Sequence, residues 1–376
     1  MMSKKIDLLI AGAGPVGCVI AERAASQLDW RVLVVEKADH IAGMCHDDFH
    51  ESGIFIHRHG PHYFRTNNKN LIAYLSKFTG WLDSDYIVKS FTNEILYPFP
   101  INLTTLELFF SRSFTESSAR QFLESRREKI DTPRNSEEFV LSRVGRELYE
   151  AFYLGYTLKA WDMHPRDLSP SVLGRIPVRF NRNERYVDHD FQKTPSQGFT
   201  AMFQAMLDHP NIELRLNMEY QDILKEGLVP RATVFSGLVD EYFHYSIGKL
   251  PWKSREFQFQ YFDQPLKQPC VQINYPNQHD YLRTFEIKHL TKQDRDGTVV
   301  VYEYPRPDGG IPYYPIPTDD TAKLYAAYAE LARQETIRNH VYFCGRLARY
   351  TYINTDQAIE MALETFGSIQ KDCHDA

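Results

Sequence analysis

The sequence predicts an α/β fold in which a parallel sheet begins near the N-terminus and is completed near the C-terminus. Three observations predict it. Apolar runs at 6–11 and 31–36 flank a glycine-rich turn. Charged segments with helical spacing fill 104–161, and apolar–polar alternation with a period of two fills 255–304. A last apolar run at 341–345 closes on a glycine, so the α/β pattern returns after a helical and an antiparallel-sheet region.

Bulk properties are typical of an enzyme with small-molecule partners. The 376 residues allow two or three packed units, and a net charge of -6 with dispersed basic residues argues against a nucleic-acid partner. The five cysteines show no CxxC spacing, which predicts neither a zinc site nor a disulfide framework. No apolar run of about 18 residues occurs, so we expect a cytoplasmic protein without membrane insertion.

The glycine-rich turn predicts a dinucleotide site. Gly12, Gly14 and Gly17 stand at GxGxxG spacing between the first apolar run and an amphipathic segment. These glycines allow the tight turn, the approach of backbone to a pyrophosphate, and close packing of the helix. The second apolar run ends in Glu36, whose carboxylate can accept hydrogen bonds from an adenosine ribose. Together these features predict a Rossmann-type domain.

The middle of the chain has helical spacing. Asn135 with Glu138 resembles a capping box. Apolar residues then recur on one expected helical stripe at Val140, Val144, Leu148 and Phe152. Proline at 177 disfavours helix at the residue before it, so an extended loop is expected after Arg175.

Alternation further along predicts an antiparallel sheet with one wet face. Phe257 and Phe259 alternate with Gln258 and Gln260, and 271–275 repeats the pattern. Arg283 stands on an apolar strand face, where an unpaired charge is costly. Taken alone, that position fits a structural ion pair as well as a ligand site.

The C-terminal segment predicts the last strand and a final helix. The strand at 341–345 is followed by Asn354 or Thr355 as a helix cap. The expected apolar face of that helix comprises Ile359, Ala362, Leu363 and Phe366. A helix that starts beside the completed sheet can point at the pyrimidine end of a flavin, which favours FAD over NAD.

Six ordered motifs resemble the UDP-galactopyranose mutases, a family of FAD enzymes. Besides the glycine turn with Glu36, they are HRHGPH at 57–62, GYTLKAW at 155–161, RIPVRF at 175–180, SGLVD at 236–240, PYYP at 312–315 and CGRLA at 344–348. The resemblance runs nearly end to end. It implies a discontinuous FAD-binding domain (1–80, 198–240 and 316–376), a helical domain with a mobile substrate loop (100–180) and an antiparallel sheet domain (81–99, 181–197 and 241–315).

The resemblance also implies an activity. Family members interconvert the pyranose and furanose forms of a nucleotide-diphosphate sugar, with N5 of the reduced flavin attacking the anomeric carbon and no net oxidation. The product class is galactofuranose or a related sugar for polysaccharide biosynthesis, and the expected assembly is a homodimer. No metal is implied.

Site residues carry over position by position from the family motifs. Arg175, Arg283 and His62 match catalytic positions. The substrate set comprises Phe152, Tyr156, Thr157 and Trp161 around the uracil, Tyr186, Tyr314 and Tyr352 on the diphosphate, and Asn354 near the sugar. The expected FAD contacts are Gly12, Gly14, Pro15, Val16, Gly17, Glu36, Lys37, Gly43, Met44, His62, Arg346 and Thr355.

Departures from the family pattern cluster near the cofactor and the sugar. Met44 stands where the family usually has Asn, Arg65 where it often has His, and Asn354 where it has Asp. Replacing a carboxylate by an amide alters which sugar hydroxyls are accepted. The candidate substrates are therefore UDP-galactose, UDP-N-acetylgalactosamine and a dTDP-6-deoxysugar such as dTDP-fucose. Two other classes stay open: a redox flavoenzyme of the amine-oxidase or nicotinamide-dependent type, and a non-catalytic nucleotide-sugar-binding flavoprotein.

Overall fold

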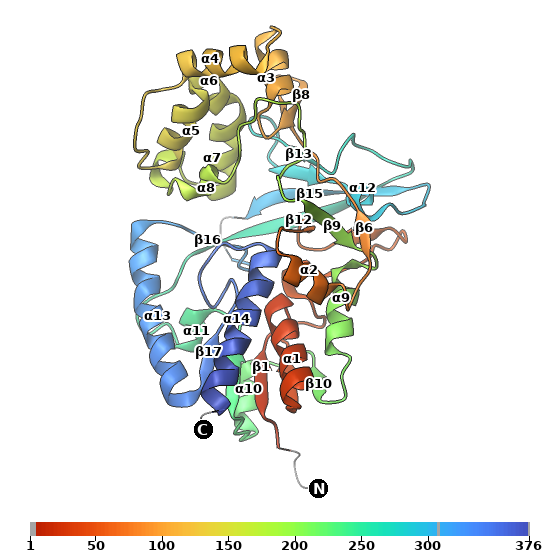
Figure 1. Ribbon diagram of the computed structural model, residues 1–376, viewed down its shortest axis with the longest axis vertical. Helices are drawn as coiled ribbons and strands as arrows, with labels where there is room; N and C mark the ends of the chain where they lie inside the picture. The colour runs from red at the N-terminus through yellow and green to blue at the C-terminus, as the bar shows by residue number, and fades with distance from the viewer. Residues whose placement is uncertain (1–4, 307–308, 375–376) are drawn as a thin grey trace.

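A five-stranded parallel sheet forms the lower half of the computed structural model, which describes residues 5–306 and 309–374 (Figure 1). The strand order is β10-β2-β1-β11-β17, and every neighbouring pair is parallel. The strands are β1 (Leu8–Ala11), β2 (Val32–Val35), β10 (Ile212–Arg215), β11 (Ala232–Phe235) and β17 (Val341–Phe343). In register, Leu8 of β1 lies opposite Val32 on one side and Ala232 on the other. The predicted joining of N- and C-terminal strands in one sheet is confirmed.

Helices cover both faces of this sheet. Leu8 and Ile10 pack with α1 (Pro15–Leu28), α2 (Lys69–Leu75), α9 (Gly198–Leu207) and α14 (Thr355–His374). Leu9 and Ala11 face α10 (Tyr220–Lys225), α11 (Val239–Tyr242) and α13 (Asp319–Asn339). Burial on both faces explains why the strands are continuous apolar runs rather than alternating ones.

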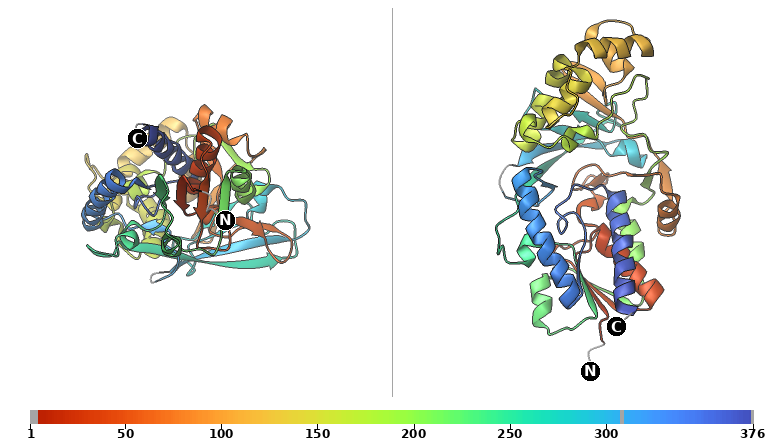
Figure 2. Two further views of the ribbon diagram at one scale, coloured as in Figure 1. Left: turned by 90° about the horizontal axis from the view of Figure 1, so that it is seen from below. Right: turned by 60° about the vertical axis from the view of Figure 1, so that its left-hand side comes forward.

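A seven-stranded sheet crosses above the carboxyl ends of the parallel strands (Figures 1 and 2). Its order is β16-β12-β15-β14-β13-β7-β8. The strands are β7 (Val88–Thr92), β8 (Ile95–Phe99), β12 (Trp252–Phe262), β13 (Gln272–Asn274), β14 (Arg283–Phe285), β15 (Thr298–Arg306) and β16 (Tyr314–Pro315). All neighbouring pairs are antiparallel except β7 and β13, which are parallel.

The expectation of one wet face holds for β12 and is wrong for β13. Gln258 and Gln260 are exposed, as alternation predicts. Gln272 and Asn274, however, are buried beside the cavity, where Gln272 accepts from the Tyr86 hydroxyl at 2.6 Å and donates to the Asn274 side-chain oxygen at 2.7 Å. Amides that read as solvent-facing in the sequence are therefore part of an internal polar wall.

The helical unit lies at the top of Figure 1 and shares one hydrophobic core with the seven-stranded sheet. It comprises α3 (Leu103–Phe110), α4 (Glu116–Arg126), α5 (Ser136–Val144), α6 (Arg146–Tyr149), the π-helical turn η2 (Glu150–Leu154), α7 (Gly155–Trp161), the 3-10 turn η3 (Pro165–Asp167) and α8 (Ser171–Gly174). The predicted single stripe is broken at Gly145, whose φ is 80° and whose added Cβ would lie 2.5 Å from the Arg126 carbonyl oxygen. Its four apolar members are nevertheless all buried.

The predicted capping box at the start of α5 forms only in part. The Asn135 side chain accepts a hydrogen bond from the Glu138 N–H at 2.8 Å. The Glu138 carboxylate instead accepts from the N–H and the guanidinium of Arg134. A nearby cation therefore replaces the reciprocal contact that the spacing predicts.

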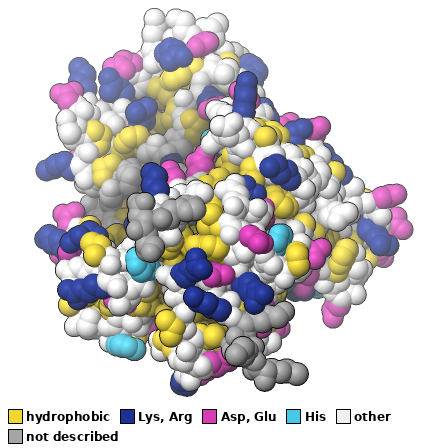
Figure 3. Space-filling view, turned by 60° about the horizontal axis from the view of Figure 1, so that its bottom comes forward, with side chains coloured by type: hydrophobic (Ala, Val, Ile, Leu, Met, Phe, Trp, Pro, Cys, Tyr) yellow, Lys and Arg dark blue, Asp and Glu magenta, His cyan; other side chains and the backbone are white. Residues whose placement is uncertain are grey.

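Shorter elements connect these layers. They are η1 (Gly43–Cys45), the ribbon of β3 (Asp47–Phe49) and β4 (Phe55–His57), the small sheet of β5 (Phe64–Thr66), β9 (Phe191–Pro195) and β6 (Trp81–Asp83), and α12 (Lys288–Thr291). Acidic and basic side chains are interspersed over the face shown in Figure 3. Among the described residues, no helix is both long and apolar enough to cross a bilayer.

Candidate active site

The glycine turn between β1 and α1 has the geometry of a phosphate cradle. Gly12 has a φ of +110°, and a Cβ added to Gly17 would lie 1.9 Å from the Gly12 carbonyl oxygen. Helix α1 starts at Pro15 without a side-chain cap on its first N–H groups. Gly43 also approaches closely, because its added Cβ would lie 3.2 Å from the Gly14 Cα. This glycine-only surface at a helix N-terminus fits a dinucleotide pyrophosphate.

Glu36 links this turn to the second strand. Its two carboxylate oxygens accept hydrogen bonds from the backbone N–H groups of Ala13, at 2.8 Å, and Ala38, at 2.9 Å. Each oxygen keeps a lone pair for another donor, such as a ribose hydroxyl. Lys37, the next residue in the predicted cofactor set, is exposed.

A cavity of about 1150 Å³ lies between the parallel strands, the seven-stranded sheet and the helical unit. Every residue predicted for the substrate or for catalysis lines it, together with four of the predicted cofactor residues. The first group is Arg175, Arg283, Phe152, Tyr156, Thr157, Trp161, Tyr186, Tyr314, Tyr352, Asn354 and His62, and the second is Met44, His62, Arg346 and Thr355. The fold thus gathers residues as far apart in the chain as Met44 and Thr355, while their individual roles stay predictions.

Cations and phenols form a layered cluster on one wall. The Arg175 guanidinium carbon lies 4.2 Å from the Tyr352 ring centre, and Tyr352 stacks on Tyr314 at 5.4 Å. The Arg346 guanidinium carbon is 5.4 Å from the Tyr352 ring. Arg175 forms no ion pair with any residue in 5–306 or 309–374. An exposed guanidinium without a carboxylate partner, beside two phenols, is suited to a diphosphate.

Arg283 is held from behind by a glutamate that sequence reasoning missed. Its Nε donates to Glu303 at 2.6 Å, and Arg255 Nε donates to the other oxygen of the same carboxylate at 3.2 Å. Burial alone would lower the pKa of Arg283, but Glu303 outweighs it and raises that pKa well above the ordinary value. Both readings of Arg283 therefore apply: it is in an ion pair, and it lines the cavity as a fixed cation.

The missed glutamate does have a sequence signal. Glu303 follows the apolar run 299–302 and is 1% exposed, although it lies on a strand that reads as core. A charge inside such a run is costly unless it is paired. That cost predicts a cationic partner, but the partner is fixed only by the register that sets Arg283 opposite Glu303.

The predicted base pocket contains an unsatisfied polar atom. Thr157 is 1% exposed, and its hydroxyl oxygen has no hydrogen-bond partner among the described residues. Phe152 and Trp161 are also buried, and Tyr156 joins them on the cavity wall. Because buried hydroxyls normally have partners, this one fits a ligand that supplies a polar edge between aromatic faces.

His62 is a neutral hydrogen-bonding group. Burial lowers its pKa to about 3, with further lowering by His57 and Arg346. Its Nδ1 lies 2.9 Å from the Gly60 carbonyl oxygen, which can only accept. Nδ1 therefore carries the proton, and Nε2 is available as an acceptor.

Asn354 occupies the predicted N-cap position before α14, and its carbonyl oxygen accepts from the Ala358 N–H at 2.9 Å, but its side chain acts as a donor. Its backbone N–H and its side-chain Nδ2 both donate to the Gln357 side-chain oxygen, at 3.0 and 3.2 Å. Thr355 is already the first residue of α14, and its hydroxyl lies 3.6 Å from the Cys45 sulfur. The Asn354–Gln357 contact is therefore the half of a capping box in which the N3 side chain accepts from the N-cap backbone N–H.

Comparisons with known proteins agree with this geometry. A family model described as UDP-galactopyranose mutase matches residues 151–352, and one described as an NAD(P)-binding Rossmann-like domain matches 10–78. A "probable UDP-galactopyranose mutase" of Klebsiella pneumoniae is 35% identical, covering 96% of this chain and 93% of its own. The dTDP-fucopyranose mutase of Escherichia coli is 32% identical, covering 95% and 96%. A crystal structure of reduced UDP-galactopyranose mutase superposes with a TM-score of 0.73 at 15% identity, over 98% of this chain and 96% of that one. A redesigned putrescine oxidase superposes with a TM-score of 0.55 at 13% identity, over 98% and 100%.

Proposed function

The chain belongs to the UDP-galactopyranose mutase family, and on that premise we propose that it interconverts the pyranose and furanose forms of a UDP- or dTDP-linked sugar in the cavity described above. It is a flavin-dependent mutase, and the cofactor of this family is FAD. The nucleotide sugar, the residue roles and the cellular setting are the parts proposed here.

One observation supports the assignment of the cavity more than any other. The exposed Arg175 guanidinium, without an ion pair among the described residues, shares a wall with Tyr314, Tyr352 and the glutamate-held Arg283. Two cations and two phenols at one place match the charge and the hydrogen-bonding capacity of a diphosphate. The glycine turn and Glu36 fit the adenosine diphosphate part of FAD, and Arg346, Thr355 and Met44 would hold its flavin end.

The residues of the cavity bind the nucleotide sugar and orient its parts. Bound FAD in its reduced form supplies the nucleophile for the anomeric carbon. Arg175 and Arg283 bind the diphosphate and retain it in the cavity once its bond to the sugar breaks. Tyr314 and Tyr352 donate hydrogen bonds from their phenol O–H groups to the diphosphate oxygens. Phe152 and its neighbours fix the base, which sets the distance from base to anomeric carbon. His62 accepts a hydrogen bond at Nε2 without adding charge.

The redox alternative shares only the fold with this chain. Putrescine oxidase superposes at 13% identity, whereas the two sugar mutases are related over nearly the whole length of both chains. An amine oxidase also has no need of a diphosphate site. A non-catalytic nucleotide-sugar-binding flavoprotein would use the same diphosphate wall, and it is distinguished from a mutase by the absence of furanose formation when reduced.

The candidate sugars are galactose, N-acetylgalactosamine and a 6-deoxysugar such as fucose. Relatives that act on a UDP-linked and on a dTDP-linked sugar match this chain about equally well. Asn354 and Arg65 line the cavity where the family more often has other side chains, which supports a sugar different from galactose. We place the product, a furanose donor for polysaccharide biosynthesis, in the cytoplasm, and a homodimeric assembly stays a prediction.

Product analysis tests the proposal directly. Reduced holoenzyme is incubated with UDP-galactose, UDP-N-acetylgalactosamine and dTDP-fucose, and furanose formation is followed by chromatography and NMR. Conversion of at least one nucleotide sugar, lost when the flavin is kept oxidised, is expected. Stoichiometric consumption of oxygen or NAD(P)H, without any furanose, would identify a redox enzyme instead.

The pH dependence of nucleotide binding gives a second prediction. Burial opposes ionisation of Tyr352, but Arg175, then Arg346 and Arg283, outweigh it and lower the pKa of this phenol to about 8. Above that pH the phenolate adds negative charge beside the diphosphate. Affinity for UDP should therefore fall as the pH rises through 8, by up to about tenfold per pH unit, because binding favours the protonated phenol.

Calorimetric titration of wild type and Tyr352→Phe with UDP, from below to above this pKa, measures the effect. The phenylalanine variant lacks the titrating phenol, so its affinity should decline less over the same range. An equal decline in both proteins would assign the pH dependence to another group.

A further inference from the structure

Helix α7 is tied to the seven-stranded sheet through Lys159, a residue that the cavity itself does not use. Lys159 lies on the helix that carries Tyr156, Thr157 and Trp161. Its Nζ donates to four backbone carbonyl oxygens of one loop: those of Gln278 at 3.3 Å, His279 at 3.1 Å, Tyr281 at 3.1 Å, and Tyr275. We call residues 275–281 the β13–β14 loop.

The carbonyls of this loop converge on a single cation. Burial lowers the pKa of Lys159 to about 8, with Asp280 acting in the opposite direction. The ammonium is thus the main form at neutral pH, and its N–H groups donate hydrogen bonds to these oxygens. Without the cation, the four carbonyl dipoles would point at one another at close range, so the loop would relax away from this conformation.

Two further contacts hold the same loop against the helix. Asn277 Nδ2 donates to the Ala151 carbonyl oxygen of η2 at 3.0 Å. Gly155, the first residue of α7, lets the loop approach, because an added Cβ would lie 2.5 Å from both the Asn277 side-chain oxygen and the Pro276 carbonyl oxygen. The loop and the base-pocket helix are therefore in close contact along several residues.

The ends of this loop lead directly into the cavity. Asn274, at the end of β13, and Arg283, at the start of β14, flank the loop, and both line the site. Any shift of the loop relative to α7 changes the distance from the base pocket to Arg283. A bound nucleotide would have to span that distance between its base and its diphosphate.

We propose that Lys159 is a positioning residue for nucleotide binding, which sets the spacing between the base pocket on α7 and the diphosphate-binding Arg283 by fixing the β13–β14 loop. This inference rests on the proposed function. Lys159 does not line the cavity, so its loss should change affinity for the nucleotide more than turnover at saturation.

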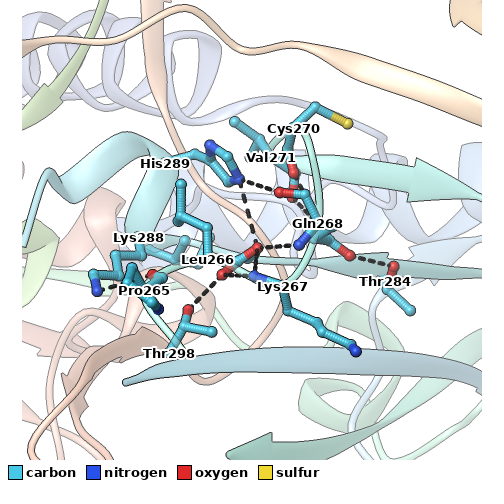
Figure 4. Close-up of polar contacts among 12 residues, drawn as sticks. Pro265, Leu266, Lys267, Gln268, Cys270, Val271, Thr284, Lys288, His289 and Thr298 are labelled. Carbon is cyan, nitrogen blue, oxygen red and sulfur yellow. Dashed lines mark hydrogen bonds and ion pairs between the residues drawn. The ribbon is translucent and has the colours of Figure 1, made fainter. Parts of the chain in front are cut away.

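The chain offers a matched control on the same sheet. Lys288 of α12 also donates from Nζ to backbone carbonyls, those of Pro265 at 3.0 Å, Gly297 at 2.9 Å and Arg295. It lies within the polar network of Figure 4, which also includes Gln268, Thr284 and Thr298, and it does not line the cavity. Lys288→Met removes a comparable set of hydrogen bonds away from the site.

The test compares Lys159→Met, Lys159→Arg and Lys288→Met as FAD-loaded proteins, by UDP calorimetry, by steady-state kinetics and by thermal unfolding. Lys159→Met should bind UDP at least about tenfold more weakly, because a misplaced charge-assisted hydrogen bond to the diphosphate corresponds to roughly that factor. Its KM should rise more than its kcat falls, and Lys159→Arg should recover part of the affinity. Lys288→Met should lose thermal stability while keeping its UDP affinity.

Each contrary result is distinguishable. Unchanged UDP affinity in Lys159→Met, or equal weakening in both methionine variants, would overturn the positioning role. If Lys159→Met does not fold, Asn277→Ala removes another tie to the same loop and should weaken UDP binding, and an unchanged affinity there would also overturn the proposal. Failure of the wild-type protein to bind or convert any UDP- or dTDP-sugar would instead count against the proposed function.

Discussion

Replacing Arg283 by alanine is expected to lower kcat/KM by about a thousandfold. Its side chain is half-buried, is fixed by Glu303 at 2.6 Å, and lines the cavity that we assign to the diphosphate. Loss of one partner from a desolvated charge pair in a binding site costs about 4 kcal/mol, which corresponds to that factor. Steady-state kinetics of the reduced enzyme and UDP calorimetry measure the two parts of the loss.

Two variants separate the ligand role of Arg283 from its structural ion pair. Arg283→Lys keeps the charge but loses the planar fork, so it should retain part of the affinity. Arg182 is an exposed arginine paired with Glu107 outside the cavity, and Arg182→Ala should leave kcat/KM unchanged. If Arg283→Ala were destabilised yet bound UDP normally, Arg283 would be a structural cation only.

The second large effect is expected from Gly17→Ala, which should yield protein with little or no bound flavin. The added methyl group would lie 1.9 Å from the Gly12 carbonyl oxygen and 3.2 Å from a methyl carbon of Ile10. Relief requires α1 to move away from β1, which opens the turn that we assign to the pyrophosphate. Overpacking of this kind costs about 1–3 kcal/mol of folding free energy. Flavin absorbance per mole of protein and thermal unfolding measure both effects.

Gly367 provides the matched control, because it is also a helical glycine. A Cβ added there in α14 would meet no atom within 4 Å. Gly367→Ala should bind FAD normally and gain up to about 1 kcal/mol of stability from helix propensity. Normal flavin content in Gly17→Ala would show that the glycine turn tolerates displacement. It would contradict the assignment of this turn as the FAD pyrophosphate site.

Local signals predicted much of this protein. The glycine turn, the buried runs that became β1, β2 and β17, and the apolar face of α14 are short patterns whose meaning does not depend on distant residues. Predictions from these local signals were wrong where another residue changed the local conformation or hydrogen bonding. The helical stripe is interrupted at Gly145, where a φ of 80° ends α5, and the Glu138 carboxylate of the predicted capping box accepts from Arg134 instead.

Long-range pairings explain what sequence reasoning missed in the site. Glu303 follows the apolar run 299–302, and only the strand register places its carboxylate between Arg283 and Arg255. Alternation predicts Gln272 on a solvated face, yet it is buried and bonded to Tyr86, which is 186 positions away in the chain.

The amino-acid order by itself determined the fold class, the mutase family and the residues that surround the cavity, since periodicity and contiguous motifs are properties of short segments. Only the tertiary structure decided which charges neutralise each other and which loop Lys159 holds. Such contacts join residues that are tens to hundreds of positions apart in the chain. Their energies depend on the distance between the two groups and on the burial of both, which are set only when the sheets pack together.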